Sequence, residues 1–143
     1  MKRITVLLAD GNRLVRRAYR GILEREDDLR VVGEAKNGRQ AVAMVKKLRP
    51  ALVLMATVMP VLDGLHATRQ ILKSFPATNV LMLSSYSDDA YVEAAISAGA
   101  MGYLLKQSSA ETVCPAIRQV HKGKSFFSPS IPRSLRKRNR QTS

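Results

Sequence analysis

Apolar residues fall in five short runs along this chain, and each run is followed by a stretch in which apolar residues recur every three or four positions. Runs that are apolar at consecutive positions are typical of strands buried on both faces of a parallel sheet. The longer spacing between the runs is that of one helix face. The predicted strands are Ile4–Ala9, Val31–Ala35, Leu52–Met55, Val80–Ser84 and Met101–Leu105.

Alternating strand–helix units predict an α/β fold, with a doubly wound, five-stranded parallel sheet and five helices. The common arrangement is flavodoxin-like (CheY-like), with strand order 2-1-3-4-5 and a ligand crevice at the carboxyl ends of strands 1 and 3. The residues that follow the strands should therefore line one crevice. They are Asp10, Gly11, Ala56, Ser84 and Lys106.

Two signals conflict at the last predicted helix. Ser108 and Glu111 have the spacing of a capping box, which predicts a helix that opens there. Pro115 would then lie inside the helix, where it lacks an amide donor and its ring clashes with the preceding turn. We expect either a kink or a later start of this helix.

Composition places the chain among globular proteins. Its 143 residues are enough for one ordinary domain, and a hydrophobic content of 45% excludes a disordered chain. No apolar run approaches the ~20 residues of a membrane-spanning helix. The single cysteine, Cys114, excludes an internal disulfide and fits a reducing compartment. We therefore expect a cytoplasmic protein without a membrane segment.

The net charge of +13 is concentrated toward the end of the chain, because no acidic residue follows Glu111. We expect a folded domain over residues 1–126 and a basic linker or tail over residues 127–143. Such a tail can contact nucleic-acid phosphates without reading sequence. The alternative is a linker that its charge keeps solvated. The basic residues past Glu111 are Arg118, Lys122, Lys124, Arg133, Arg136, Lys137, Arg138 and Arg140.

Arginines also gather on the first predicted helix. Arg13, Arg16, Arg17 and Arg20 share one face at helical spacing. This stripe is either a docking or phosphate-contacting surface or a solvated charged face.

Five segments, in order, resemble the receiver domain of response regulators, in the NarL/FixJ group whose receivers usually precede a LuxR-type helix-turn-helix. The resemblance implies a pocket in which two acids of the first loop hold Mg²⁺ and an aspartate after the third strand accepts a phosphoryl group. A serine or threonine, an aromatic residue and a lysine complete that pocket. The segments, within residues 3–129, are VLLADGNRLVRRAYRGIL, VVGEAKNGRQAV, RPALVLMATVMPVLDGLHATRQI, VLMLSSYSDDAYVEAAISAGAMGYLLK and AIRQVHKGKSFFSP.

The chain matches part of that pocket. Asp10 stands at the first acid, and Ser84 stands at the hydroxyl that ends the fourth strand. Tyr103 and Lys106 stand at the aromatic residue and the lysine. The resemblance therefore implies that these four residues are what is left of a phosphate site and its switch.

Two positions depart from the family pattern. Gly11 occupies the place of the second acid, and Ala56, four residues before the proline, occupies the place of the phosphoacceptor. A methyl group has no lone pair for nucleophilic attack, and Thr57 should point away from the pocket because strand neighbours alternate. One carboxylate, Asp10, leaves Mg²⁺ short of ligands. We expect no phosphorylation, no metal and no other cofactor, with Asp10 paired to Lys106.

The sequence thus predicts a receiver module, not an enzyme, that regulates by protein contact without phosphorylation. The expected partners are a histidine kinase or another protein, a second copy of the chain, and DNA through an output domain that this chain lacks. Two alternatives stay open. One is an ordinary Mg²⁺-dependent receiver in which Ala56 replaces the acceptor aspartate, and the other is non-specific nucleic-acid binding by the basic tail.

Overall fold

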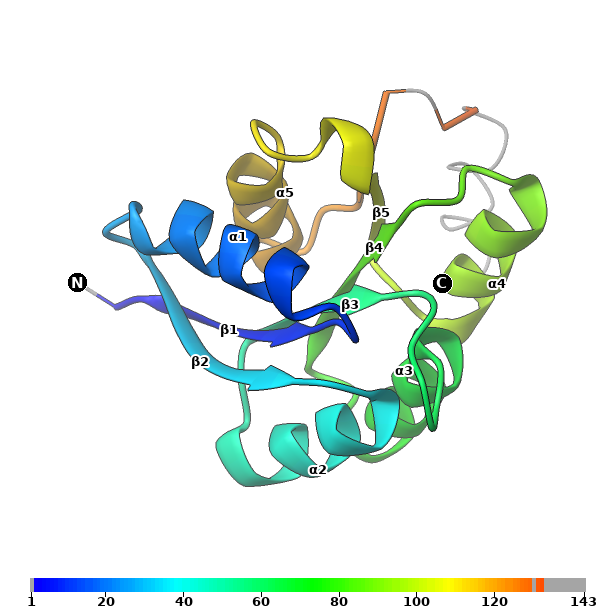
Figure 1. Cartoon of the computed structure of the whole chain (residues 1–143), viewed down its shortest axis with the longest axis horizontal. Helices are drawn as coiled ribbons and strands as arrows, with labels where there is room; N and C mark the ends of the chain where they lie inside the picture. Colours follow the sequence, from blue (N-terminus) through cyan, green and yellow to red (C-terminus); the bar gives the residue numbers. More distant parts are fainter. Residues whose placement is uncertain (1, 130, 133–143) are drawn as a thin grey trace.

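A parallel sheet between two layers of helices makes up the protein, whose computed structural model describes residues 2–129 and 131–132 (Figure 1). All five predicted strands are present, with ends that differ by at most two residues from the prediction. They pair in the predicted order, 2-1-3-4-5. The strands are β1 (Ile4–Ala9), β2 (Leu29–Ala35), β3 (Leu52–Ala56), β4 (Asn79–Ser84), β5 (Gly102–Leu105) and β6 (Phe126–Phe127).

The sheet has six strands and not the predicted five, because the chain after the last helix pairs in parallel with β5. Gly102 lies opposite Phe126, and a Cβ atom at Gly102 would lie 2.2 Å from the Phe126 carbonyl oxygen. Only glycine permits so close an approach of another backbone. The added strand is two residues long, too short for an alternating pattern to reveal it in sequence.

Helices α1 and α5 cover one face of the sheet, and α2, α3 and α4 cover the other (Figure 1). Both faces are therefore buried, which explains why β3 and most of β4 are apolar at consecutive positions. The helices are α1 (Arg13–Glu24), α2 (Gly38–Leu48), α3 (Gly64–Ser74), α4 (Asp89–Ala98) and α5 (Val113–His121).

The last helix begins later than the capping-box spacing predicts. It starts at Val113 after a 3-10 turn at Lys106–Ser108, and its N-cap residue, Thr112, makes no side-chain cap. Pro115 is then in the first turn, where no intrahelical partner exists for an amide. An earlier start would have set the proline ring against a helical carbonyl group. The later start, one of the two expected outcomes, is what the structure has.

The chain continues to pack on the domain beyond residue 126. Phe127 and Ile131 are buried in the same core as Tyr103. The Ser128 amide donates to the Tyr103 carbonyl oxygen at 3.0 Å, and Ser128 Oγ accepts the Leu105 amide at 3.0 Å. The segment after α5 is therefore part of the folded unit.

Residue 130 and residues 133–143 lie outside the described part of the chain. Most of the predicted basic tail falls there, so its expected contacts stay a prediction. Among the described helices, none is long and apolar enough to cross a membrane.

Candidate functional site

The carboxyl ends of β1 and β5 bring Asp10 and Lys106 together, as the strand order predicts. Asp10 is buried, and Lys106 Nζ lies 2.8 Å from its Oδ2 atom. The other carboxylate oxygen, Oδ1, accepts the Asn12 amide at 2.8 Å. Oδ1 thus accepts a hydrogen bond, whereas the buried Oδ2 has no hydrogen bond of good geometry among the described residues and is held by the charge of Lys106.

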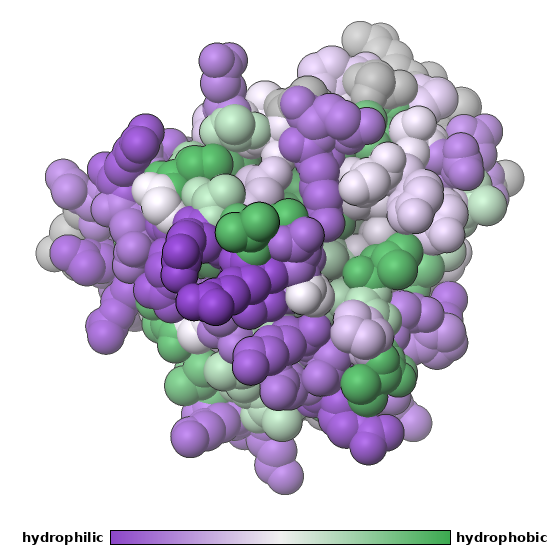
Figure 2. Space-filling view, viewed as in Figure 1, coloured by the Kyte–Doolittle hydropathy of each residue, from purple (hydrophilic) through white to green (hydrophobic). Residues whose placement is uncertain are grey.

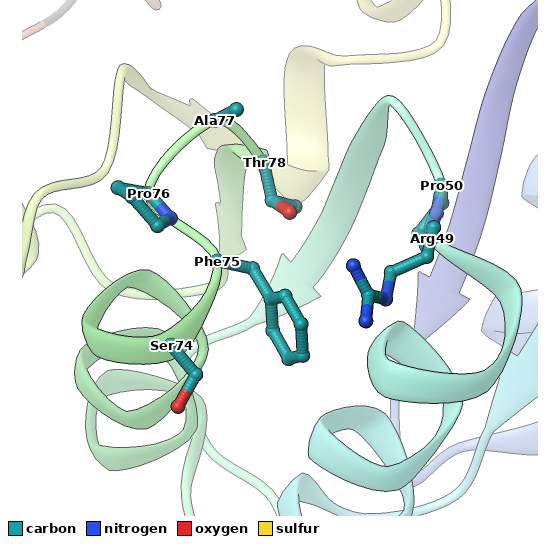
Figure 3. Close-up of a pocket in the computed structure, with 7 residues that line it drawn as sticks. All are labelled: Arg49, Pro50, Ser74, Phe75, Pro76, Ala77 and Thr78. Atoms are coloured by element: carbon teal, nitrogen blue, oxygen red, sulfur yellow. The ribbon is translucent and has the colours of Figure 1, made fainter.

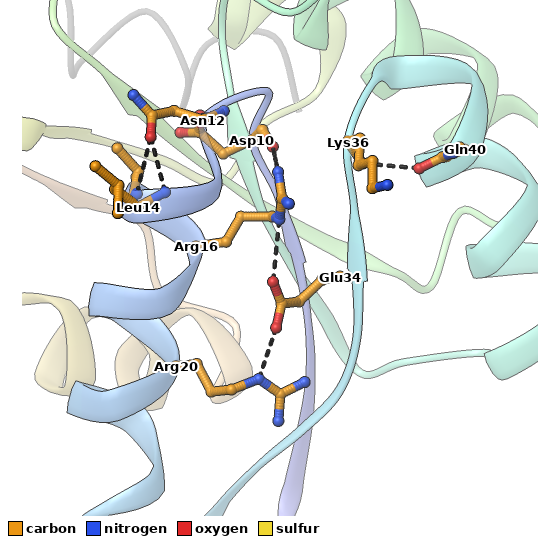
Figure 4. A network of polar contacts seen from close by, with 9 residues as sticks. Asp10, Asn12, Leu14, Arg16, Arg20, Glu34, Lys36 and Gln40 are labelled. Carbon is orange, nitrogen blue, oxygen red and sulfur yellow. Dashed lines mark hydrogen bonds and ion pairs between the residues drawn. The ribbon is translucent and has the colours of Figure 1, made fainter.

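Arg16 of α1 fixes the backbone behind Asp10 (Figure 4). It is only 6% exposed, and its Nη1 atom donates to the Asp10 carbonyl oxygen at 2.6 Å. Its Nε atom donates to Glu34 of β2 at 3.0 Å, and Arg20 donates to the other oxygen of Glu34 at 2.7 Å. The hydrogen bonds from Arg20 and Arg16 hold the pKa of Glu34 below its usual value.

Half of the arginine stripe on α1 is thus structural, which the sequence analysis did not foresee. Arg16 and Arg20 share Glu34, whereas Arg13 and Arg17 are exposed. The surface over α1 is accordingly hydrophilic and is interrupted by separate hydrophobic areas (Figure 2). The missed signal was Glu34, an acidic residue inside the predicted strand Val31–Ala35 and therefore within reach of a helix that covers the sheet.

The two departures from the family pattern lie at the same edge of the sheet. Ala56 ends β3 and is 1% exposed. Gly11 is exposed, but a Cβ atom there would lie 3.0 Å from Cδ of Pro60. The β3–α3 loop therefore packs closely on the β1–α1 loop.

A tight turn follows Pro60. The Leu62 amide donates to the Pro60 carbonyl oxygen at 2.7 Å, and Val61 between them has a φ angle of 69°. This is the geometry of a γ-turn with positive φ, which is rare and strained, above all for a β-branched residue.

Ser84 and Tyr103 belong to a second group of hydrogen bonds. Ser84 Oγ accepts from Thr57 Oγ1 at 2.8 Å and from the Tyr86 amide at 3.0 Å. The Tyr103 side chain is fully buried, and its hydroxyl donates to the Tyr86 carbonyl oxygen at 2.6 Å. Burial raises the pKa of the Tyr103 hydroxyl, so it stays protonated as a donor at neutral pH.

The bond between Thr57 and Ser84 is a contact that the sequence analysis missed. Alternation predicts that Thr57 points away from the pocket, whereas its hydroxyl contacts Ser84, one of the residues expected to line that pocket. The parallel register pairs Ala56 with Leu83, so the next residues along the two strands are Thr57 and Ser84. Side chains at paired positions share a face, and this was the signal that could have found the contact.

Among the described residues, no three histidine, cysteine, aspartate or glutamate side chains come together. A cation at the Asp10 carboxylate would have to compete with Lys106, whose Nζ atom lies 2.8 Å from Oδ2. Mg²⁺ in proteins rests on one or two carboxylates with phosphate oxygens and water, and this carboxylate is already neutralised.

A hollow of about 380 Å³ lies at the amino ends of β3 and β4, at the other end of the sheet (Figure 3). The Arg49 guanidinium stands 4.3 Å above the ring of Phe75, and Pro50 and Thr78 line the same hollow. None of the predicted site residues reaches it.

Comparison with known proteins decides the family. The model of the response regulator receiver domain matches residues 6–118. The chain belongs to the response-regulator receiver family. Receivers are signalling domains and not typical enzymes.

This receiver is similar to full-length regulators and to isolated receiver domains. It is 38% identical to the response regulator protein VraR of Staphylococcus aureus over 135 residues, which cover 94% of this chain and 65% of VraR. The chain thus spans a little under two thirds of the curated relatives it matches.

Solved structures agree on the receiver fold. One is a LuxR-family two-component response regulator from Aurantimonas sp., with 28% identity, a TM-score of 0.89 and coverage of 96% of this chain and 98% of that one. Another is the isolated receiver domain of RcsB from Salmonella enterica serovar Typhimurium, solved with the phosphomimetic BeF₃⁻. It has 25% identity, a TM-score of 0.84 and coverage of 92% and 98%.

Proposed function

We propose that this chain is the receiver module of a cytoplasmic response regulator that acts through protein contacts and does not use phosphorylation. The observation that carries the proposal is the composition of the crevice. Ala56 stands where the family has its phosphoacceptor, and Asp10 is paired with Lys106 at 2.8 Å. A phosphoryl group arriving here meets a methyl group instead of an oxygen nucleophile.

The hydroxyl groups near Ala56 do not replace the missing nucleophile. Thr57 and Ser84 are 3% and 1% exposed, and they are bonded to each other. A hydroxyl that attacks phosphorus needs a base beside it, and the carboxylate of this crevice, Asp10, accepts the Asn12 amide and is ion-paired with Lys106. We infer that neither hydroxyl is phosphorylated.

We propose that the receiver also binds no Mg²⁺ and needs no other cofactor. The pair of Asp10 and Lys106 has no net charge, and Gly11 offers no ligand. The attraction that a cluster of acids exerts on a divalent cation is therefore absent from this pair.

The relatives support a proposal for the output and the partners of this receiver. RcsB is solved in complex with DNA, and that chain matches 95% of this one with a TM-score of 0.86 and 26% identity. The match covers 69% of RcsB. We propose that DNA binding belongs to an output domain outside this chain. The receiver would supply contacts to a second copy or to another protein, such as a histidine kinase.

The test is intact-mass detection of an added phosphoryl group after incubation with acetyl phosphate and Mg²⁺. We expect no adduct on the unaltered chain. Ala56→Asp alone should recover little, because Gly11 still leaves the metal one acid short. The double variant Gly11→Asp, Ala56→Asp should recover Mg²⁺-dependent labelling, because the two neighbouring positions act together.

Gly11→Asp alone is the matched control, since it adds an acid without an acceptor and should give no adduct. Pro60 must shift by a few tenths of an ångström to admit the new Cβ atom, so each variant is first checked for cooperative unfolding. Labelling of the unaltered chain at a crevice residue would overturn the proposal and would favour an ordinary phosphorylated receiver.

A further inference from the structure

The hollow at the amino ends of β3 and β4 is a concave site at the end of the sheet opposite the crevice (Figure 3). Its volume of about 380 Å³ falls within the usual range of small-molecule pockets, ~300–1,000 Å³. One wall is the segment that follows α2, and the other is the segment that follows α3 (Figure 3). A ligand held here would therefore touch the ends of both helices.

Hydrogen bonds of the backbone fix the two walls. The Thr78 amide donates to the Phe75 carbonyl oxygen at 3.0 Å, and Pro76 is the second residue of this turn, the position that proline favours. The Asn79 amide donates to the Ala51 carbonyl oxygen at 3.1 Å, which ties one wall to the other. The shape of the hollow is thus set without a ligand, as in most ligand sites.

Arg49, directly after α2, stands in a conformation that favours glycine. Its φ angle is 48°, in the left-handed region where many helices end with glycine, and side chains held there gather at binding sites. Its guanidinium carbon lies 4.3 Å from the centre of the Phe75 ring, and its Nε atom donates to the Lys46 carbonyl oxygen at 3.0 Å. Within the described part of the chain, Arg49 makes no ion pair. Its two Nη atoms are the donors that a ligand can use.

The two helices that end at this hollow carry basic residues and no acidic ones. No acidic residue lies between Glu34 and Asp63 or between Asp63 and Asp88. The lysines in the last turns of α2 and α3 complement the helix dipoles, whereas Arg49 follows its helix and lines the hollow. An anion is therefore favoured here over a cation. The basic residues of the two helices are Arg39, Lys46, Lys47, Arg69 and Lys73.

We propose that this hollow binds a small aromatic carboxylate. The two Nη atoms of Arg49 match the two oxygens of a carboxylate, and Thr78, whose hydroxyl is a further donor, lines the same space. Pro50 and Pro76 offer apolar surface to the ring of the ligand. Among the described residues that line the hollow, Arg49 alone is charged, so we expect a ligand with one negative charge. The proposal does not rest on the proposed function, because the hollow shares no described residue with the crevice.

The test is a titration of the full chain with naphthalene-2-carboxylate, followed by the NMR resonances of the backbone amides. We expect saturable shifts at Ser74, Ala77 and Thr78 and none at Asp10. The melting temperature should rise, because the ligand binds the folded state. Naphthalene-2-carboxamide has the same ring without the charge, and it should bind at least about tenfold more weakly, since it loses a charge-assisted pair of hydrogen bonds.

Three variants assign the binding to Arg49. Arg49→Asn removes the guanidinium, and asparagine tolerates the left-handed conformation, so binding of the carboxylate should weaken about tenfold or more. Arg49→Lys keeps the charge without the planar fork and should not restore full binding. Lys47→Gln is the matched control, because Lys47 is an exposed cation at the end of α2 that does not line the hollow. It should bind as the unaltered chain does.

An absence of shifts at Ser74 and Thr78 would overturn the proposal. Equal binding of the carboxylate and the carboxamide would also overturn it, and so would equal weakening by Lys47→Gln and Arg49→Asn, which would indicate general charge attraction. If Arg49→Asn does not fold, the two ligands on the unaltered chain still decide the role of the charge. Phe75→Leu then tests the site, since it removes the ring that supports the guanidinium and should weaken binding of the carboxylate.

Discussion

At the scale of single residues, the backbone of Val61 is strained by the turn in which it lies. The γ-turn after Pro60 gives it a φ angle of 69°, and its side chain is 69% exposed, so little packing offsets the strain. A left-handed conformation costs a non-glycine residue of order 1–3 kcal/mol. The turn persists because it sets Leu62, whose carbonyl oxygen accepts the Gly38 amide at 2.9 Å.

Val61→Gly should therefore stabilise the protein. Relief of the strain exceeds the entropy that glycine loses on folding, ~0.5–1 kcal/mol, and we expect a gain of about 1 kcal/mol. The measurement is the free energy of unfolding from urea titration. Val58→Gly is the control, because Val58 is exposed in the same loop without a positive φ angle and should lose stability. A loss of stability in Val61→Gly would show that the turn is unstrained.

Residue identity predicted some contacts of the crevice and not others. The pair of Asp10 and Lys106 could be anticipated, because strand order places the two residues at one edge and their opposite charges attract. To predict the contact of Thr57 with Ser84, one needs the register between β3 and β4, which the sequence of a single strand does not reveal. To predict the burial of Arg16, one needs to know which helix covers β2.

At the scale of elements, a fork of hydrogen bonds joins α5 to the turn between α1 and β2. Arg118 Nε and Nη2 donate to the two oxygens of Asp28 at 2.7 and 2.9 Å, and Nη2 also donates to Glu26 at 2.6 Å. Such two-pronged arginine–carboxylate contacts are the stronger kind of ion pair. These contacts hold α5 against the turn between α1 and β2. The apolar pattern of the sequence does not predict this contact.

This fork predicts a dependence of stability on pH. The hydrogen bonds from Arg118 hold the pKa of Asp28 below its ordinary value. A carboxyl whose pKa is lowered by folding stabilises the protein above its unfolded pKa of about 4 and loses that contribution as pH falls through the folded pKa. Arg118→Met should therefore lower stability at pH 7 and leave it nearly unchanged near pH 2.

The expected difference at pH 7 is about 1 kcal/mol, because the side chains are a third exposed and solvent weakens the pair. The measurement is the free energy of unfolding as a function of pH. Arg17→Met is the control, since Arg17 is exposed and takes part in none of the ion pairs among the described residues. Equal losses for Arg118→Met at pH 7 and pH 2 would assign the effect to packing.

Elements with a long apolar pattern could be predicted from the sequence. A very short strand and a helix with conflicting sequence signals could not. β1 has the predicted ends because five of its six residues are apolar and the charged Asp10 follows directly. β6 escaped because its two residues carry no periodicity. The start of α5 was undetermined because a capping signal and Pro115 contradicted each other, and the steric demand of the proline prevailed.

At the scale of the whole molecule, the folded unit extends past the boundary expected at residue 126. Ile131 is 2% exposed and Phe127 is 8% exposed. Both belong to the core on the face covered by α2, α3 and α4. The segment after α5 therefore passes the edge of the sheet at β5 and completes the opposite core.

Ending the chain after residue 126 should destabilise the domain by at least ~3 kcal/mol, since it removes two buried apolar side chains and the contacts of Ser128. Ending it after Pro132 retains every described contact and should leave stability unchanged. Urea unfolding of the two shortened chains and the full chain makes the comparison. Equal stability of the three would place the segment outside the cooperative unit.

The close approach of Pro60 to Gly11 has an evolutionary consequence. An aspartate introduced at position 11 alone would press on Pro60 and would find no acceptor to serve. An aspartate introduced at position 56 alone would add a second carboxylate at the edge of the sheet where Asp10 already takes the charge of Lys106. We therefore expect each substitution to be unfavourable without the other. A receiver with this pocket would have no easy route to the acidic pocket of its family by one substitution at a time.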